Sequence, residues 1–271
     1  MPDTRESALR GDCAQCFGLC CVALPFARSA DFAVDKSAGD PCRNLQDDFR
    51  CGIHARLRPS GFQGCTVYDC FGAGQRVSQV TFGGVSWREA PETARQMYEV
   101  FPVVRQLHEL LRYLTEALER PAARRLHGEL RAALARVEEL AALPAADLEK
   151  LDVGPVRAEV NPLLLRTSEL VRATAGGKPR GRRGADLIGK RLPGAKLRGT
   201  DLRGALLIAA DLTGADLTLT DLIGADLRDA DLSGAVLTDA LFLTQPQLNA
   251  ARGDAATVLP PGFERPSHWA S

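Results

Sequence analysis

The chain has 271 residues, a length that suits one large domain or two modest ones. Lys plus Arg and Asp plus Glu both number 34, so the formal net charge is zero, which argues against a nucleic-acid-binding surface that is basic as a whole. Hydrophobic residues make up 45% and aromatic residues only 6%, a composition that favours leucine- and alanine-rich helices and repeats over a β-sandwich.

The apolar residues do not gather into a membrane-spanning segment, because no run reaches the ~18 residues that such a helix needs. The first 11 residues are polar and charged, without the apolar core of a secretory signal. We therefore expect a cytoplasmic protein with no membrane partner. In that reducing compartment disulfides are rare, and clustered cysteines indicate metal or redox chemistry.

All eight cysteines lie in the first quarter of the chain, which predicts a separate cysteine-rich, metal-binding module over residues 1–88. A C-x2-C pair can chelate one metal ion from a tight turn, and thiolate ligands favour zinc or iron–sulfur over hard cations. Adjacent cysteines are expected to point apart and not to bind the same ion. The predicted metal ligands, enough for two tetrahedral sites or one cluster, are Cys13, Cys16, Cys20, Cys21, Cys42, Cys51, Cys65 and Cys70. Redox disulfides and inert buried thiols are the alternatives.

The spacing of these cysteines resembles a family of zinc- or iron-chelating domains whose signature opens with C-x2-C and a C-C pair. The resemblance covers about residues 11–72 and includes Cys42-x2-Leu45, Cys51-Gly52-Ile53-His54 and Cys65-x4-Cys70. It implies that the cysteines bind zinc or iron, with an iron–sulfur cluster included. Here C-x3-C-C replaces the usual C-x2-C-C, so the kind of metal centre stays open. His54 is either a nitrogen ligand or a half-buried polar residue.

Residues 89–175 predict a helical hairpin or bundle. One apolar stripe with helical spacing runs from Met97 to Leu118 and a second from Leu126 to Leu140. Pro102 is expected to kink or restart the first helix, and Asn161-Pro162 to begin the last one. Before these helices, a turn is predicted at residues 72–74 and a short strand at 77–82. His108 and His127 are assigned no role.

A basic, glycine-rich linker is predicted over residues 176–183. It is either a solvated hinge or a contact for phosphate or an acidic partner.

The C-terminal part repeats with a period of five, which fits neither an α-helix nor simple strand alternation. Large apolar residues recur at every fifth position, and the residue two places earlier is mostly alanine. The pattern predicts a narrow coil in which these two positions face the axis, with each coil pairing with the next at about 4.8 Å. The large positions are Leu187, Leu192, Leu197, Leu202, Leu207, Leu212, Leu217, Leu222, Leu227, Leu232, Leu237 and Phe242.

This pattern resembles the pentapeptide-repeat family, with Ala185-Asp186-Leu187, Ala215-Asp216-Leu217 and Ala225-Asp226-Leu227 as the clearest copies. The resemblance implies a right-handed quadrilateral β-helix, a solenoid with four pentapeptides per coil, over residues 184–243. Because Lys190 replaces a small residue, the first coil is expected to be irregular before about Gly194. Residues 244–271 predict a cap and tail: Thr244 and Gln247 form a capping box, Leu248 covers the last coil, and the tail from Gly253 wraps back loosely.

Three functions fit this organisation, and no catalytic residues are predicted. The first is a metal-binding protein whose solenoid docks a protein partner. The second is a redox enzyme that uses an iron–sulfur cluster or thiols. The third is a DNA mimic that binds gyrase, but residues 184–243 hold nine Asp against six Lys or Arg, too mixed for a long acidic stripe. Binding of nucleic acid is not expected, and the sequence leaves the oligomeric state open.

Overall fold

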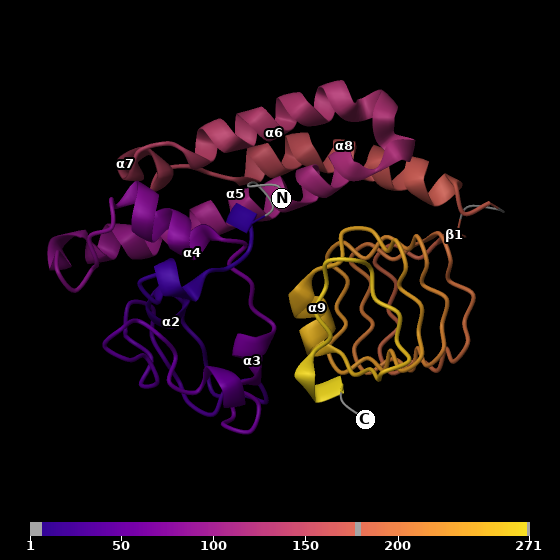
Figure 1. Ribbon diagram of the computed structural model, residues 1–271, viewed down its shortest axis with the longest axis horizontal. Coiled ribbons are helices and arrows are strands. Elements are labelled where there is room, and N and C mark those ends of the chain that lie inside the picture. Colours follow the sequence, from indigo (N-terminus) through magenta and orange to yellow (C-terminus); the bar gives the residue numbers. More distant parts are fainter. Residues whose placement is uncertain (1–6, 177–179, 270–271) are drawn as a thin grey trace. The chain divides into compact units, whose positions relative to one another are not determined.

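The computed structural model describes residues 7–176 and 180–269, which form two compact units (Figure 1). Unit 1 comprises Met1–Glu119 and Leu126–Leu163, and unit 2 comprises Arg120–Arg125 and Leu164–Ser271. Residues 177–179 of the predicted basic linker lie outside the described part. None of the described helices combines the length and apolar character that crossing a membrane requires.

Unit 1 begins with short elements separated by loops, and longer helices follow. The short elements are η1 (Cys13–Gln15), α2 (Leu19–Val22), η2 (His54–Arg56), α3 (Gln63–Thr66), α4 (Ala73–Gln75), η3 (Arg76–Thr81) and η4 (Pro91–Thr93). The helices that follow, some of which extend into unit 2, are α5 (Ala94–Glu119), η5 (Pro121–Leu126), α6 (His127–Ala141), α7 (Ala145–Leu148) and α8 (Gly154–Ala173).

Helices α5 and α6 pack side by side as the predicted hairpin. Met97, Val104 and Leu114 of the first predicted stripe are fully buried, and so are Leu130 and Val137 of the second. Helix α5 continues through Pro102 without a restart. Burial of the apolar stripe on both sides of this residue stabilises the helix against the loss of one backbone hydrogen bond.

Two local predictions are wrong. The last helix begins at Gly154 and not at Asn161, because the Asp152 carboxylate accepts a hydrogen bond from the Gly154 N–H at 2.8 Å and caps the earlier start. Residues 76–81 form a π-helix in place of the predicted strand, closed by a hydrogen bond from Phe82 N–H to the Val77 carbonyl at 3.0 Å. Burial of Val77 and Ser78 in this helix overrides the preference of β-branched residues for strands.

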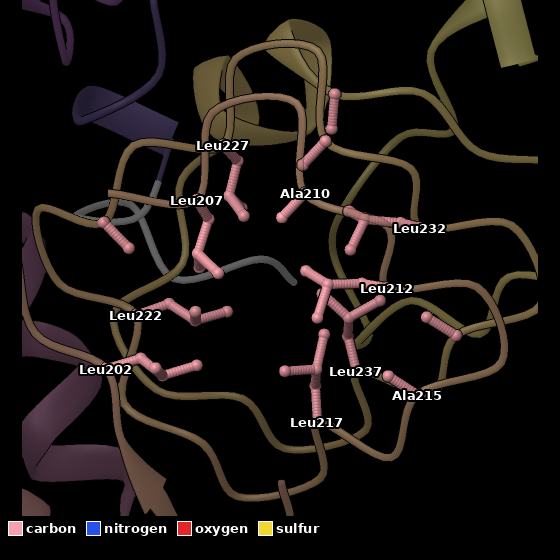
Figure 2. Close-up of a cluster of buried hydrophobic side chains, with 14 of the residues drawn as sticks. Leu202, Leu207, Ala210, Leu212, Ala215, Leu217, Leu222, Leu227, Leu232 and Leu237 are labelled. Atoms are coloured by element: carbon pink, nitrogen blue, oxygen red, sulfur yellow. The ribbon is translucent and has the colours of Figure 1, made fainter. Parts of the chain in front are cut away.

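Unit 2 contains the predicted solenoid. Strands β1 (Arg180–Gly181) and β2 (Thr200–Asp201) pair in parallel, and Arg180 lies opposite Thr200. The isolated bridges Asp186↔Leu206, Leu206↔Asp226 and Asp221↔Leu241 keep the same separation. Four pentapeptides therefore complete one coil. The leucines of successive coils point inward and stack along the axis (Figure 2).

Each pentapeptide turns a corner in a left-handed backbone conformation. Hydrogen bonds such as Lys190 N–H to the Leu187 carbonyl, 3.1 Å, close a four-residue turn around this corner. Glycine occupies most corners, with Gly189 at a φ of 61° and Gly214 at 66°, while Ala209 and Leu219 adopt the same conformation at 53° and 58°. Glycine suits the position because it has no β-carbon to clash.

Both ends of the solenoid are more regular than expected, since an irregular first coil and a loose tail were predicted. The first coil is regular, since Arg182, Leu187 and Leu192 donate backbone hydrogen bonds to the second coil. At the other end, α9 (Gln245–Ala250) has the predicted capping box, and Leu248 is fully buried. The tail adds bridges from Arg252 and Val258 and ends in η6 (Ser267–Trp269), and it is not loose because Trp269 is buried against unit 2.

The corner conformation gives a testable stability difference. A β-carbon at Gly214 would meet no other group within 4 Å, so Gly214→Ala should test the positive φ alone and lower the free energy of unfolding by about 1 kcal/mol. Ala209→Gly at the equivalent corner should have the opposite sign. Denaturant unfolding followed by Trp269 fluorescence, in a Trp87→Phe background, measures unit 2. Equal stability of Gly214→Ala and its parent would contradict the proposed strain.

Candidate metal centre

The eight cysteines lie in short elements and loops of unit 1, and none of them forms a disulfide. Cys13 lies in η1, Cys20 and Cys21 in α2, and Cys65 in α3. Cys70 precedes α4, and Cys51 is held by a bridge to Leu45.

Backbone contacts hold the loops around the thiols. Cys42 donates its N–H to the Cys21 carbonyl at 2.9 Å. The Lys36 ammonium donates to the carbonyls of Val22, Ser37 and Asp40 at 2.9–3.0 Å. One cationic side chain therefore ties the loop of residues 36–40 to the end of α2.

Backbone N–H groups near three of the sulfurs lower the pKa of those thiols. These groups belong to Gly18 and Leu19 near Cys16, Ile53 near Cys51, and Gly72 and Gly74 near Cys70. They lower the pKa because the partial positive charge of an N–H stabilises the thiolate. Burial acts more strongly in the opposite direction and raises the pKa of Cys16 to about 11.

Gly74 lies next to two of these sulfurs, and its lack of a side chain leaves room for both. A β-carbon at Gly74 would lie 2.7 Å from Cys16 Sγ and 3.8 Å from Cys70 Sγ. The two thiols therefore flank the same glycine.

Negative charge on one thiolate raises the pKa of the thiols near it, and these effects show which cysteines are neighbours. Besides burial, a Cys70 thiolate raises the pKa of Cys13, Cys16 and Cys20. Burial raises the pKa of Cys65 to about 12, and the neighbouring Cys21, Cys42 and Cys51 thiolates add to that shift. Loss of protons from these clustered thiols is thus unfavourable without a cation to offset the negative charge.

The adjacent Cys20 and Cys21, which were expected to point apart, interact with each other. The Cys20 thiol donates a hydrogen bond to the Cys21 sulfur, which lowers the pKa of Cys21, and the Lys36 ammonium lowers it further. The same bond and burial raise the pKa of Cys20. Lys36 is a functional neighbour that the sequence did not reveal, because it lies 15 residues along the chain in a loop without a motif.

The side chains as placed do not form a complete metal site. Across residues 7–176 and 180–269, no group of three or more His, Cys, Asp or Glu side chains is arranged to hold a metal ion. His54 is exposed at the start of η2. The donor set fits a soft metal ion in its chemistry, but binding would require the thiols to rotate towards a common centre.

Comparisons with known proteins identify the repeat and one full-length relative. The model of the family "Pentapeptide repeats" matches residues 183–214 and 200–239. The "Uncharacterized protein YybG" of Bacillus subtilis (strain 168) is 62% identical over 264 residues, which cover 96% of this chain and 95% of the relative.

Solved pentapeptide-repeat structures match a smaller part. Rfr23 from the cyanobacterium Cyanothece 51142 is 34% identical over 29% of this chain and 52% of its own, with a TM-score of 0.26. The protein alr5209 from Nostoc Pcc 7120 is 30% identical over 40% of this chain and 93% of its own, with a TM-score of 0.24. The chain thus spans about half of the first of these structures.

The thiol pKa values predict an order of alkylation in metal-free protein. Cys16 has a pKa of about 11, whereas that of Cys21 is lowered below 9.0. At pH 8, iodoacetamide should therefore modify Cys21 at least about tenfold faster than Cys16, since each pKa unit is about tenfold in thiolate. The rate at Cys21 should level off at a lower pH than the rate at Cys16. Peptide mass spectrometry measures both rates.

The variant Lys36→Met should slow alkylation of Cys21 and leave Cys16 unchanged, because the ammonium stabilises the Cys21 thiolate and does not act on Cys16. Equal rates at the two thiols would contradict the assigned electrostatics.

Proposed function

The chain is a pentapeptide-repeat protein of the same family as YybG of Bacillus subtilis, and on this premise we propose that it is a metal-dependent binding protein. Its thiols bind zinc or iron, including iron in an iron–sulfur cluster, and its solenoid docks a protein partner. The metal, when bound, supplies the positive charge that neutralises the thiolates and cross-links the loops of unit 1.

The observation that carries the metal assignment is that backbone N–H groups favour the thiolate forms of Cys16, Cys51 and Cys70 among eight free thiols. Buried thiols that stay protonated have no need of several amide donors. Thiolates that bind a metal do, because hydrogen bonds to the sulfurs stabilise and tune such centres.

We divide the eight ligands into two sets of four by the strongest thiolate neighbours, and the two sets adjoin because Cys21 and Cys51 also raise the pKa of Cys13. We define the first thiol group as Cys13, Cys16, Cys20 and Cys70, and the second thiol group as Cys21, Cys42, Cys51 and Cys65. Four thiolates are the usual ligand set of a closed structural zinc site and of an iron–sulfur cluster.

A thiol-based redox enzyme is the second candidate, favoured by one observation. The hydrogen-bonded pair of Cys20 and Cys21 joins a thiol of raised pKa to a neighbour of lowered pKa. A low thiol pKa is what a nucleophilic cysteine needs. The Lys36 ammonium activates Cys21 further, but this candidate uses only two of the eight thiols, so metal binding is the better-supported function.

The surface of the solenoid supports docking of a protein and not mimicry of DNA. The bridged columns mix charges, since Arg191 stacks on Asp211 and Lys196 on Asp216. In the column of Asp201 and Asp221, the negative charge of the buried Asp221 is neutralised by Arg203, with 3.1 Å between Nη1 and Oδ2. A phosphate mimic needs an unbroken row of negative charge, whereas alternating charges suit the complementary surface of a protein.

Metal analysis tests this proposal. The full chain purified without oxygen should carry about two equivalents of zinc or of iron centres, one for each thiol group. Cys70→Ser should remove the metal of the first thiol group only, and Cys65→Ser that of the second. Elemental analysis, native mass spectrometry and visible absorption report the metal, its stoichiometry and any cluster.

His54→Ala is the matched control, because this exposed residue stands three places after Cys51 and should leave the metal content unchanged. Loss of all metal in both cysteine variants would indicate one shared centre. Protein that contains no metal, and whose thiols are all freely alkylated, would refute the metal proposal.

A further inference from the structure

The charge of the solenoid changes sign along its axis. Residues 181–200, which we call the basic coil, carry six Lys or Arg and one Asp, a net charge of +5. Residues 201–220 carry one Arg and three Asp, a net charge of −2, and residues 221–240 carry one Arg and five Asp, a net charge of −4. Positive charge is thus concentrated at one end of the solenoid, although the chain as a whole is neutral. The six basic residues of the basic coil are all exposed: Arg182, Arg183, Lys190, Arg191, Lys196 and Arg198.

The basic coil also has an open backbone edge at Asp186. One coil further on, the equivalent Leu206 donates its N–H to the Ala185 carbonyl at 3.0 Å and accepts from the Leu187 N–H at 2.8 Å. The N–H and carbonyl of Asp186 would need a preceding coil to bond in the same way. No backbone group in the described part of the chain bonds to either of them.

Arg191 repeats this arrangement on the next side of the basic coil. Its neighbour Asp211 donates its N–H to the Lys190 carbonyl at 2.9 Å and accepts from the Leu192 N–H at 2.7 Å. The N–H and carbonyl of Arg191 itself have no backbone partner among the described residues. Asp186 and Arg191 are both exposed, and an exposed edge of this kind is a template for a further strand.

Other edges of the solenoid are covered by the chain itself. Strand β1 lies on the side of Thr200 and Asp201, and Arg172 of α8 donates to the Gly199 carbonyl at 3.4 Å. The far end is covered by Leu248 and Trp269. The open edge is therefore a local feature of the two sides that contain Asp186 and Arg191.

The hydrophobic core is also incomplete at this edge. Ala185 and Leu192 pack against the core of the solenoid but are only partly buried, whereas Ala205 and Leu212 one coil further on are fully buried. Because side chains alternate along a strand, a further strand could place every second side chain over the core and the others outside. Apolar residues suit the inner positions, and acidic residues suit the outer positions beside the basic side chains.

We infer that this edge docks an extended acidic segment of a partner protein in which acidic and apolar residues alternate. The inference rests on the proposed docking role of the solenoid and names its surface and the chemistry of its partner. The segment bonds to the N–H and carbonyl groups of Asp186 and Arg191, and its apolar side chains cover Ala185 and Leu192. Its carboxylates lie beside the exposed Lys and Arg side chains.

Two other occupants fit the edge less well. A second copy of the basic coil would bring two net charges of +5 together, which is unfavourable. A nucleic acid would match the charge, but it lacks the alternating N–H and carbonyl groups that pair with a strand edge.

Fluorescence anisotropy of the full chain with three labelled peptides tests this edge. The first peptide alternates glutamate and valine, the second is the same peptide N-methylated at its valines, and the third alternates lysine and valine. The valine N–H groups are the ones that would point to the edge, so N-methylation removes the backbone pairing and keeps the charge. The first peptide should bind at least about tenfold more tightly than either of the others.

Matched variants locate the binding site on the chain. Lys190→Glu/Arg191→Glu should weaken binding of the glutamate–valine peptide at least about tenfold, because it reverses two charges beside the edge. Arg131→Glu/Arg136→Glu, which changes two exposed arginines of α6 and shifts the net charge equally, should bind as the parent does. Bound peptide should also slow amide hydrogen exchange at Asp186 and Arg191, but not at Asp211, whose N–H is already bonded.

Four results would overturn the inference: no binding of the glutamate–valine peptide at millimolar concentration, equal binding of the N-methylated peptide, tighter binding of an oligothymidylate of matched charge, or a dimer of the parent that Lys190→Glu/Arg191→Glu dissociates. Peptide binding that survives Lys190→Glu/Arg191→Glu would also overturn it, but would leave a docking role to another surface of the solenoid. Near-ultraviolet circular dichroism verifies folding, and if the double variant does not fold, the peptides and hydrogen exchange still decide. Cys70→Ser and Cys65→Ser should retain peptide affinity, which separates this edge from the metal proposal.

Discussion

A pentapeptide of unit 2 can bury its leucine only between two neighbouring coils, and this dependence on stacked neighbours governs the whole solenoid. Leu207, Leu212 and Leu217 are almost completely inaccessible because coils lie on both sides of them. The parallel hydrogen bonds between residues 20 apart fix the spacing at which those side chains meet. A coil without a neighbour would expose both its core and its backbone edge. The C-terminal side of the stack is covered accordingly by Leu248 and Trp269.

The loops of unit 1 lack such a repeating ladder, and their order depends on individual side chains. Lys36 bonds three carbonyls, and the rings of Phe26 and Phe32 stack with their centroids 4.3 Å apart. The turn at Gly72 adjoins two features, since its N–H lowers the pKa of Cys70 and the residue also lines a cavity of unit 1.

The sequence predicted the solenoid well because one physical rule repeats in every pentapeptide, so that single departures such as Lys190 do not hide it. The left-handed corner of each pentapeptide was not predicted, although glycines at Gly189, Gly194 and Gly199 recur there every five residues. Single events were harder to predict: the true start of α8 depends on one carboxylate, and the π-helix depends on how Val77 packs. The cysteines were found by their spacing, but the hydrogen bond between Cys20 and Cys21 and the approach of Lys36 depend on loop geometry that no short motif encodes. The cavity escaped notice because Leu9, Arg76, His108 and Ala142 are widely separated in the chain.

The four-sided coil also limits how such a chain can change in length. Duplication of a whole coil would move the cap along the axis and leave its orientation unchanged, because Leu248 would still meet the same side of the stack. Insertion of a single pentapeptide would instead turn α9 and the tail by a quarter of a revolution. Arg252 and Val258 would then face columns other than those of Asp231 and Val236, with which they now pair. Tandem duplication in steps of 20 residues is thus the route by which this architecture can lengthen and still keep its terminal cover.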